Sequence, residues 1–174
     1  MSRVIALIGA PGAGKSSVGK LLAEHLELRF TDVDAEVEAD TGKLIREIFA
    51  DDGEARFREL ERDASIAALS GGGVVSLGGG AVMTPAVADA LTDVTVVWLA
   101  VSVTQASRRV GLNQARPLLL GNLRGTLIKL LAERTPVYQR LATITVDTDN
   151  SPVTAVVEQI VAALEEVNGE DLDR

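Results

Sequence analysis

The sequence predicts an α/β fold in which a central parallel sheet of five strands is flanked by helices on both faces. Short apolar runs of strand length alternate with longer segments of helical character along the chain, as in strands joined by helical crossovers. The five runs are VIALI (4–8), the weaker LRF (28–30), VVSL (74–77), VTVVWLAV (94–101) and ITV (144–146). A chain of 174 residues is long enough for one domain with one core. We expect this domain over residues 1–168, with a flexible polar tail at 169–174.

Composition and charge narrow the class of partner. With a formal net charge of -8, the protein lacks the excess positive charge that would attract the phosphates of nucleic acid. No cysteine is present for disulfides or a thiolate zinc site. No apolar stretch approaches the ~20 residues of a membrane span, and Met1 leads into the first strand without a signal-peptide pattern. We therefore expect a cytoplasmic protein with a small-molecule partner. We also expect a monomer, although no pattern in the sequence reports the oligomeric state.

The first strand runs directly into GAPGAGKSS at 9–17. The spacing G-x-x-x-x-G-K-S from Gly9 to Ser16 is typical of loops whose backbone N–H groups cradle a phosphate. Residues 17–26 continue as a helix, which places the loop at a positive helix N-terminus. Lys15 can reach the outer phosphates, and the Ser16 hydroxyl can enter the shell of a bridging Mg²⁺. A purely structural glycine turn would need no lysine, so the stretch predicts a nucleotide site.

The second strand is followed by TDVDAE, which carries Asp32 and Asp34. Side chains two positions apart on an extended segment point to the same side. Asp34 could simply cap the helix that follows. Beside a phosphate loop, at the carboxyl ends of parallel strands, the pair is better explained as one metal-directed and one substrate-directed carboxylate.

The helix that begins near Asp52 has two distinct faces. We expect an apolar face to be buried, formed by Phe57, Leu60, Ala64 and Ala67. The opposite face is polar, so it either has a function or faces the solvent. It carries Arg58, Glu61, Arg62 and Ser65. An exposed ion pair with Glu54, one turn earlier, is the simplest role for Arg58.

Three later segments bear on function. SLGGGAV at 76–82 allows close backbone approach by a ligand, although a glycine turn into the next element is an alternative. The mixed segment at 111–125 fits an inserted lid. It contains Arg116, while Arg134 lies in AERTPVY; either arginine could bind an anion or be ordinary surface charge. Residues 152–167 form a docking helix, and His25 is a surface or capping residue of the first helix.

In order and spacing, six stretches resemble the shikimate kinases, small P-loop kinases, from about Val4 to the last helix. They are GAPGAGKSS, TDVDAEVEADTGKLIREIF, FRELE, SLGGGAV, ARPLL and ERTPVY. The resemblance implies a P-loop kinase fold, a substrate-binding helical region at about 32–62 and a mobile lid at about 111–125. It also implies transfer of the ATP γ-phosphate to the 3-hydroxyl of shikimate, with one Mg²⁺ held by Ser16 and Asp32.

The resemblance also implies roles for individual residues. Asp34 matches the residue that holds the acceptor hydroxyl and accepts its proton, and it joins Lys15 and Arg116 as catalytic residues. Arg58 and Arg134 match the arginines that grip the shikimate carboxylate, in a pocket that Gly79 and Gly80 line. The implied ATP contacts are Gly12, Ala13, Gly14, Lys15, Ser16, Ser17, Arg109, Arg116 and Pro152.

The chain departs from the family in the loop after the last strand. This loop reads DTDNSP, without the arginine that family members often carry there, so Pro152 and backbone groups are left as the match. Arg109 in SRRVG resembles an arginine that stacks on adenine, and its neighbour Arg108 is an alternative. The lid stretch LLLGNLRG is also more apolar than an opening loop would suggest.

Two other functions compete with shikimate phosphorylation. Another small-metabolite P-loop kinase, such as a gluconate kinase, would keep the phosphate loop but would not need the arginine pair. A regulatory nucleotide-binding module would bind nucleotide without turnover, but the sequence has no N-K-x-D stretch and no D-x-x-G switch.

Overall fold

A computed structural model describes residues 3–111 and 122–172, with side chains described up to residue 167. Its centre is a parallel sheet in the order β2-β3-β1-β4-β5. The strands are β1 (Val4–Ile8), β2 (Phe30–Asp32), β3 (Gly73–Ser76), β4 (Thr95–Ala100) and β5 (Ile144–Asp147). The predicted fold class, a five-stranded parallel sheet between helices, is therefore confirmed.

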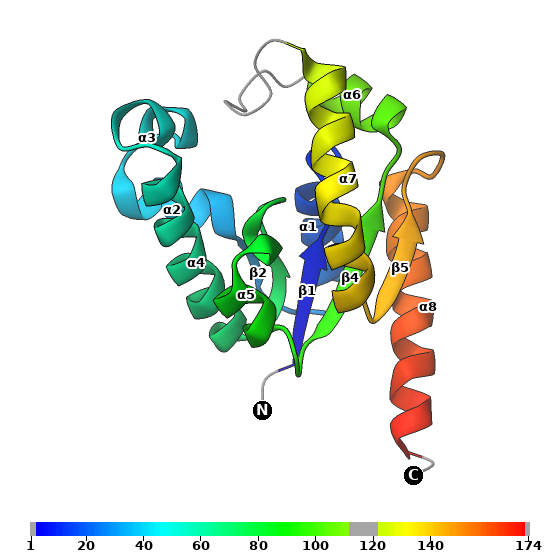
Figure 1. The fold of residues 1–174 in the computed structure, drawn as a ribbon. Helices are drawn as coiled ribbons and strands as arrows, with labels where there is room; N and C mark the ends of the chain where they lie inside the picture. Colours follow the sequence, from blue (N-terminus) through cyan, green and yellow to red (C-terminus); the bar gives the residue numbers. More distant parts are fainter. Residues whose placement is uncertain (1–2, 112–121, 173–174) are drawn as a thin grey trace.

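Helices cover both faces of this sheet (Figure 1). The helices are α1 (Lys15–His25), α2 (Val33–Thr41), α3 (Ile45–Asp51), α4 (Glu54–Gly71), η1 (Ala81–Met83), α5 (Pro85–Ala90), α6 (Val103–Gly111), α7 (Leu123–Leu141) and α8 (Val153–Leu172). Ile5 and Leu7 of β1 pack into one core cluster with α1 and α8. Ala6 and Ile8 point the other way, into a cluster that includes residues of α4, α5 and α7. The alternation of a strand thus places apolar side chains in both layers.

The second strand begins two residues later than predicted. The backbone at Leu28 is still hydrogen-bonded to the end of α1, because the Leu28 N–H donates to the Ala23 carbonyl at 2.9 Å. Glu27, just before it, has a left-handed φ of 54°. The apolar side chain of Leu28 packs against the core although Leu28 is not in the strand. Its hydrophobicity therefore indicated burial and not the start of β2.

The predicted buried face of α4 is wrong in part. The residues buried on this helix are Phe57, Glu61, Ser65, Ala68 and Leu69. Ala67 is exposed, whereas Glu61 is only 2% exposed and Ser65 is fully buried. The buried face of α4 therefore includes polar side chains. Hydrophobic periodicity alone predicts that such side chains are exposed.

The last third of the chain is more helical than the sequence suggested. α7 begins at Leu123, so residues 123–125 of the predicted lid are helical, and the Asn122 side chain caps them by accepting from the Gly125 N–H at 3.0 Å. Arg116 and the rest of the predicted lid at 112–121 lie outside the described residues. α8 continues to Leu172, into the segment expected as a tail.

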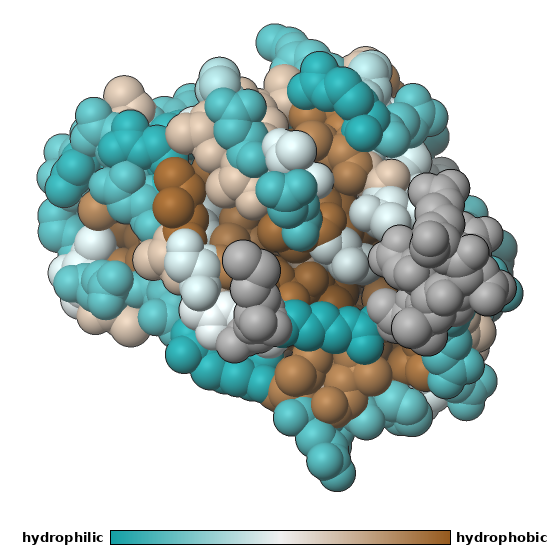
Figure 2. Space-filling view, turned by 90° about the horizontal axis from the view of Figure 1, so that it is seen from below, coloured by the Kyte–Doolittle hydropathy of each residue, from teal (hydrophilic) through white to brown (hydrophobic). Residues whose placement is uncertain are grey.

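Both termini lie at the end of the molecule opposite the carboxyl ends of the strands (Figure 1). Seen from that end, the surface shows apolar residues in its middle and hydrophilic residues around its edge (Figure 2). None of the helices in the described part of the chain has the length and apolar character needed to cross a membrane.

Candidate active site

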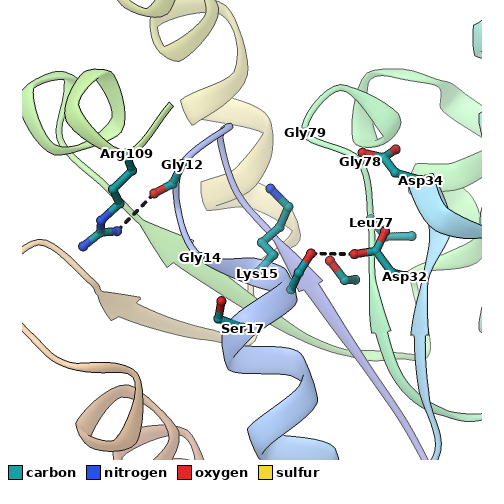
Figure 3. Close-up of a pocket in the computed structure, with 12 residues that line it drawn as sticks. Gly12, Gly14, Lys15, Ser17, Asp32, Asp34, Leu77, Gly78, Gly79 and Arg109 are labelled. Atoms are coloured by element: carbon teal, nitrogen blue, oxygen red, sulfur yellow. Dashed lines mark hydrogen bonds between the residues drawn. The ribbon is translucent and has the colours of Figure 1, made fainter. Parts of the chain in front are cut away.

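Many of the predicted site residues gather where the carboxyl ends of β1, β2 and β3 meet. These strands are neighbours in the sheet, so the segments that follow them share one edge. A cavity of about 310 Å³ lies there (Figure 3). It is lined by Gly12, Gly14, Lys15, Ser16, Ser17, Asp32, Asp34, Ser76, Leu77, Gly78, Gly79 and Arg109.

The phosphate loop at 9–14 owes its shape to glycines. Gly9, Gly12 and Gly14 all have positive φ, a region that other residues rarely adopt. A Cβ on Gly9 would lie only 2.6 Å from the Leu99 carbonyl oxygen of β4. Gly14 is the N-cap of α1, which begins at Lys15, two residues earlier than predicted. The backbone N–H groups of the first turn of α1 therefore face the cavity as an anion site.

Lys15 carries its charge inside this loop. Its side chain is mostly buried, and Nζ donates to the carbonyl oxygens of Gly9 at 2.8 Å and Ala10 at 3.2 Å. In Figure 3 the ammonium lies between Arg109 on one side and the two aspartates on the other. The loop thus holds a positive charge at the wall of the cavity.

Asp32, and not Asp34, caps α2. The Asp32 carboxylate accepts from the Ala35 N–H at 3.2 Å and from the Ser16 hydroxyl at 2.5 Å. β2 ends at Asp32, and Asp34 lies in the first turn of α2. The two side chains are thus not both on an extended segment, as the sequence had suggested, although both line the cavity.

Ser16 and Asp32 suit a hard divalent cation. A hydroxyl and a carboxylate oxygen beside a phosphate loop are ligands that Mg²⁺ accepts together with phosphate oxygens and water. Among the residues that the structure describes, no group of three or more acidic or histidine side chains could hold a metal by itself. A cation here would consequently take its remaining ligands from phosphate oxygens and water.

The glycine turn after β3, whose Gly78 and Gly79 line the cavity, has two arginines beside its last glycine, Gly80. A Cβ on Gly80 would lie 2.7 Å from Nη1 of Arg58 and 3.0 Å from Nη2 of Arg134. A Cβ on Gly78 would lie 3.2 Å from Oδ1 of Asp34. The nearest group to a Cβ on Gly78 would be the carboxylate of Glu61, so the two guanidinium groups and the carboxylates of Glu61 and Asp34 all lie along this turn. A side chain on the turn would collide with them.

Glu61 is a site residue that we did not identify from the sequence. Its carboxylate accepts from Nη1 of Arg58 at 2.6 Å, while the predicted partner Glu54 lies 3.6 Å from Nη2. Burial raises the pKa of Glu61, and the charge and hydrogen bond of Arg58 oppose this shift. The i, i+3 spacing from Arg58 was the available signal. Arg134 is only 7% exposed and lies beside Arg58 at Gly80.

Arg109 joins the phosphate loop to the loop after β5. Nη1 donates to the Gly12 carbonyl at 3.1 Å and to the Thr148 hydroxyl at 3.2 Å, and Nη2 donates to the Thr148 carbonyl at 2.6 Å. Arg108 is exposed and does not line the cavity. Pro152 is exposed just before α8. These bonds hold the guanidinium group of Arg109 between the phosphate loop and the loop after β5.

Comparisons with known proteins identify the family of the chain. A family model for shikimate kinase matches residues 11–165. A shikimate kinase of Mycobacterium avium (strain 104) is 51% identical over 160 residues, or 91% of each chain. The solved structure of shikimate kinase from Acinetobacter baumannii in complex with shikimate is similar with a TM-score of 0.92 and 32% identity, over 95% of this chain and 94% of that one.

A gluconokinase from Sinorhizobium meliloti 1021 is a more distant structural neighbour. Its TM-score is 0.61 at 22% identity, over 98% of this chain and 95% of that one. At this identity the likeness shows a shared fold and nothing about the substrate.

Proposed function

The chain belongs to the shikimate kinase family, and we propose that it transfers the γ-phosphoryl group of ATP to the 3-hydroxyl of shikimate, giving shikimate 3-phosphate and ADP. The observation that carries this proposal is the convergence of Arg58 and Arg134 on Gly80, on the glycine turn that Asp34 also borders. Two planar guanidinium groups fit a carboxylate, and a nearby carboxylate fits an acceptor hydroxyl.

The transfer requires positioning and charge stabilisation more than covalent chemistry. The acceptor oxygen forms a bond to the γ-phosphorus as the bond to the ADP oxygen breaks, and the hydroxyl proton passes to Asp34. Lys15 stabilises the negative charge on the transferring group. Ser16 and Asp32 would hold Mg²⁺, which supplies further positive charge to the phosphates when bound. Arg116, by its resemblance to the lid arginine, is proposed to add to this charge.

The other assignments follow from the same geometry. We propose that Gly12, Ala13, Gly14 and Ser17 bind phosphates through their backbone, and that Arg109 and Pro152 contact the adenine. Gly79 and Gly80 border the shikimate carboxylate. The helical region at about 32–62 has a small core of its own, formed by Val37, Ile48 and Phe57, which supports a substrate-binding part within one domain over 1–168. A cytoplasmic monomer with no nucleic-acid or membrane partner remains our expectation.

Release of ADP, measured in a coupled assay with shikimate and separately with gluconate, tests the proposed function directly. We expect Mg²⁺-dependent ADP release with shikimate and only background release with gluconate. Equal or greater turnover of gluconate would favour the other small-metabolite kinase. Tight ATP binding without turnover of either acceptor would favour a regulatory module.

Replacing Arg58 or Arg134 by Lys is expected to weaken shikimate binding about 10- to 100-fold. Lysine keeps the charge but loses the planar fork that contacts a carboxylate at two points. Affinity for ATP should stay within about twofold of the parent, because both arginines lie on the acceptor side of the glycine turn. Calorimetric titration with each substrate measures this difference.

The matched control is Arg56→Lys, because Arg56 lies on the same helix but pairs with Glu59 at the exposed surface. If Arg58→Lys and Arg134→Lys both bind shikimate as the parent does, the carboxylate contact is wrong and the substrate assignment loses its main physical support.

Gly80→Ala is expected to lower shikimate affinity by at least about tenfold while the protein stays folded. The added methyl group would lie 2.7 Å from Nη1 of Arg58 and 3.0 Å from Nη2 of Arg134, so both guanidinium groups must move. They are the ends of flexible side chains, and the backbone of Gly80 has an ordinary negative φ of -100°, so the fold itself is little affected. Gly71→Ala, which places its methyl group in ordinary contact with Arg29, is the control. Unchanged shikimate affinity in Gly80→Ala would contradict the proposed pocket.

A further inference from the structure

Tyr138 is the single tyrosine of the chain and lies in the stretch ERTPVY, and we assigned it no role from the sequence. It is fully buried on α7, and its hydroxyl donates to the Gly79 carbonyl oxygen at 2.5 Å, across 59 positions of sequence. Its ring is stacked on Trp98 of β4 with centroids 6.0 Å apart. The phenol is therefore held in place by packing and makes a specific polar contact at its tip.

The partner of this hydroxyl lies at the junction of the two halves of the site. A Cβ on Gly79 would lie 3.2 Å from Nη1 of Arg134 and 3.2 Å from Cδ of Pro11 in the phosphate loop. Tyr138 follows Arg134 by one turn of α7, so the hydroxyl and the guanidinium group reach the same point of the glycine turn.

The glycine turn depends on this contact more than an ordinary turn would. The Gly78 carbonyl accepts from the Ala81 N–H at 3.1 Å, and the Gly80 carbonyl accepts from the Met83 N–H at 3.0 Å. Those two bonds are local, whereas the Gly79 carbonyl is bonded to a side chain of another layer. Three consecutive glycines have large backbone freedom, so a bond from outside the turn restricts its position.

We propose that Tyr138 is a positioning residue of the acceptor pocket, whose hydroxyl fixes Gly79 and thereby sets Gly80 and Arg134 for the carboxylate of the acceptor. This inference rests on the proposed function for the identity of the acceptor. Burial raises the pKa of Tyr138 to about 12, against the opposing effect of Arg134, so the hydroxyl remains a donor throughout the pH range of an ordinary assay. Tyr138 touches no reacting atom in this scheme.

Tyr138→Phe tests the proposal, because it removes the hydroxyl and keeps the ring. We expect KM for shikimate to rise about tenfold, since the loss of one buried hydrogen bond is of this order. KM for ATP should change less than about twofold, and kcat at saturating shikimate less than about threefold. The control is Trp98→Phe, which alters the packing of the same ring but leaves the hydroxyl. In this variant KM for shikimate should change no more than KM for ATP.

Hydrogen exchange of the ligand-free protein provides a second measurement that needs no substrate. Amides of residues 77–83 should exchange faster in Tyr138→Phe than in the parent, and no faster in Trp98→Phe, because only the first variant releases the Gly79 carbonyl. Unchanged exchange in Tyr138→Phe would overturn the proposal.

The outcomes separate this inference from the proposed function. If the parent phosphorylates shikimate but Tyr138→Phe raises both KM values equally, or neither, the tyrosine is only structural and the inference fails alone. If the parent does not phosphorylate shikimate, the proposed function fails, and the exchange of residues 77–83 still decides whether the hydroxyl holds the turn.

Discussion

The Asp34→Asn variant is expected to lose about 10²- to 10⁴-fold in kcat, the usual contribution of a general base. The amide has nearly the shape of the carboxylate but cannot take the proton of the acceptor hydroxyl. Asp34 lies in the cavity beside Gly78, on the glycine turn that Arg58 and Arg134 also border. Binding of Mg²⁺-ATP should therefore be retained. Steady-state rates, together with calorimetric binding of ATP and shikimate, measure the difference.

Two variants serve as comparisons for Asp34→Asn. Asp40→Asn changes an exposed residue of the same helix and should behave as the parent. Asp32→Asn should mainly weaken the Mg²⁺-dependent step, because Asp32 bonds to Ser16 and caps α2. If excess Mg²⁺ fully restored the Asp34→Asn variant, the roles of the two aspartates would have to be exchanged.

The Lys15→Met variant is expected to lower kcat/KM by at least about 10²- to 10³-fold, the effect of removing one preorganised charge or donor from a transition state. Methionine fills much of the same volume, so the phosphate loop should stay folded. The change also removes the two bonds from Nζ to the loop carbonyls of Gly9 and Ala10. Activity should be measured with thermal unfolding, so that loss of charge and loss of fold are distinguished.

The matched control is Lys20→Met, which removes a charge from the exposed face of the same helix. Near-normal turnover by a folded Lys15→Met protein would contradict the assignment of the phosphate loop.

The phosphate loop and the sheet could be predicted because their signals are local. Positive φ at Gly12 and Gly14 requires glycine, and the apolar runs match the strands within two residues. Periodicity failed on α4, because Glu61 is a buried carboxylate compensated by Arg58, and hydropathy cannot report such a pair.

The part of the site that binds the acceptor could not be predicted from local sequence patterns. Arg58, Gly80 and Arg134 lie on separate elements, and only the packing of α4 and α7 on the same face of the sheet brings them together. The family resemblance supplied these three residues as a set. Tyr138 had no local signal, because a tyrosine at a helical position is ordinarily a core residue and its hydroxyl bond to Gly79 is long-range.

The central place of β1 in the sheet constrains how the protein acquires its activity. β1 pairs with β3 on one side and β4 on the other, so the strand that leads into the phosphate loop is secured only after long stretches of chain have been closed. We therefore expect the nucleotide site to form late in folding, and a fragment that ends before β4 would lack the strand against which Gly9 packs. Ligands consequently bind the fully folded chain, and at a concentration of 100 times Kd they would add about 2.7 kcal/mol to its stability.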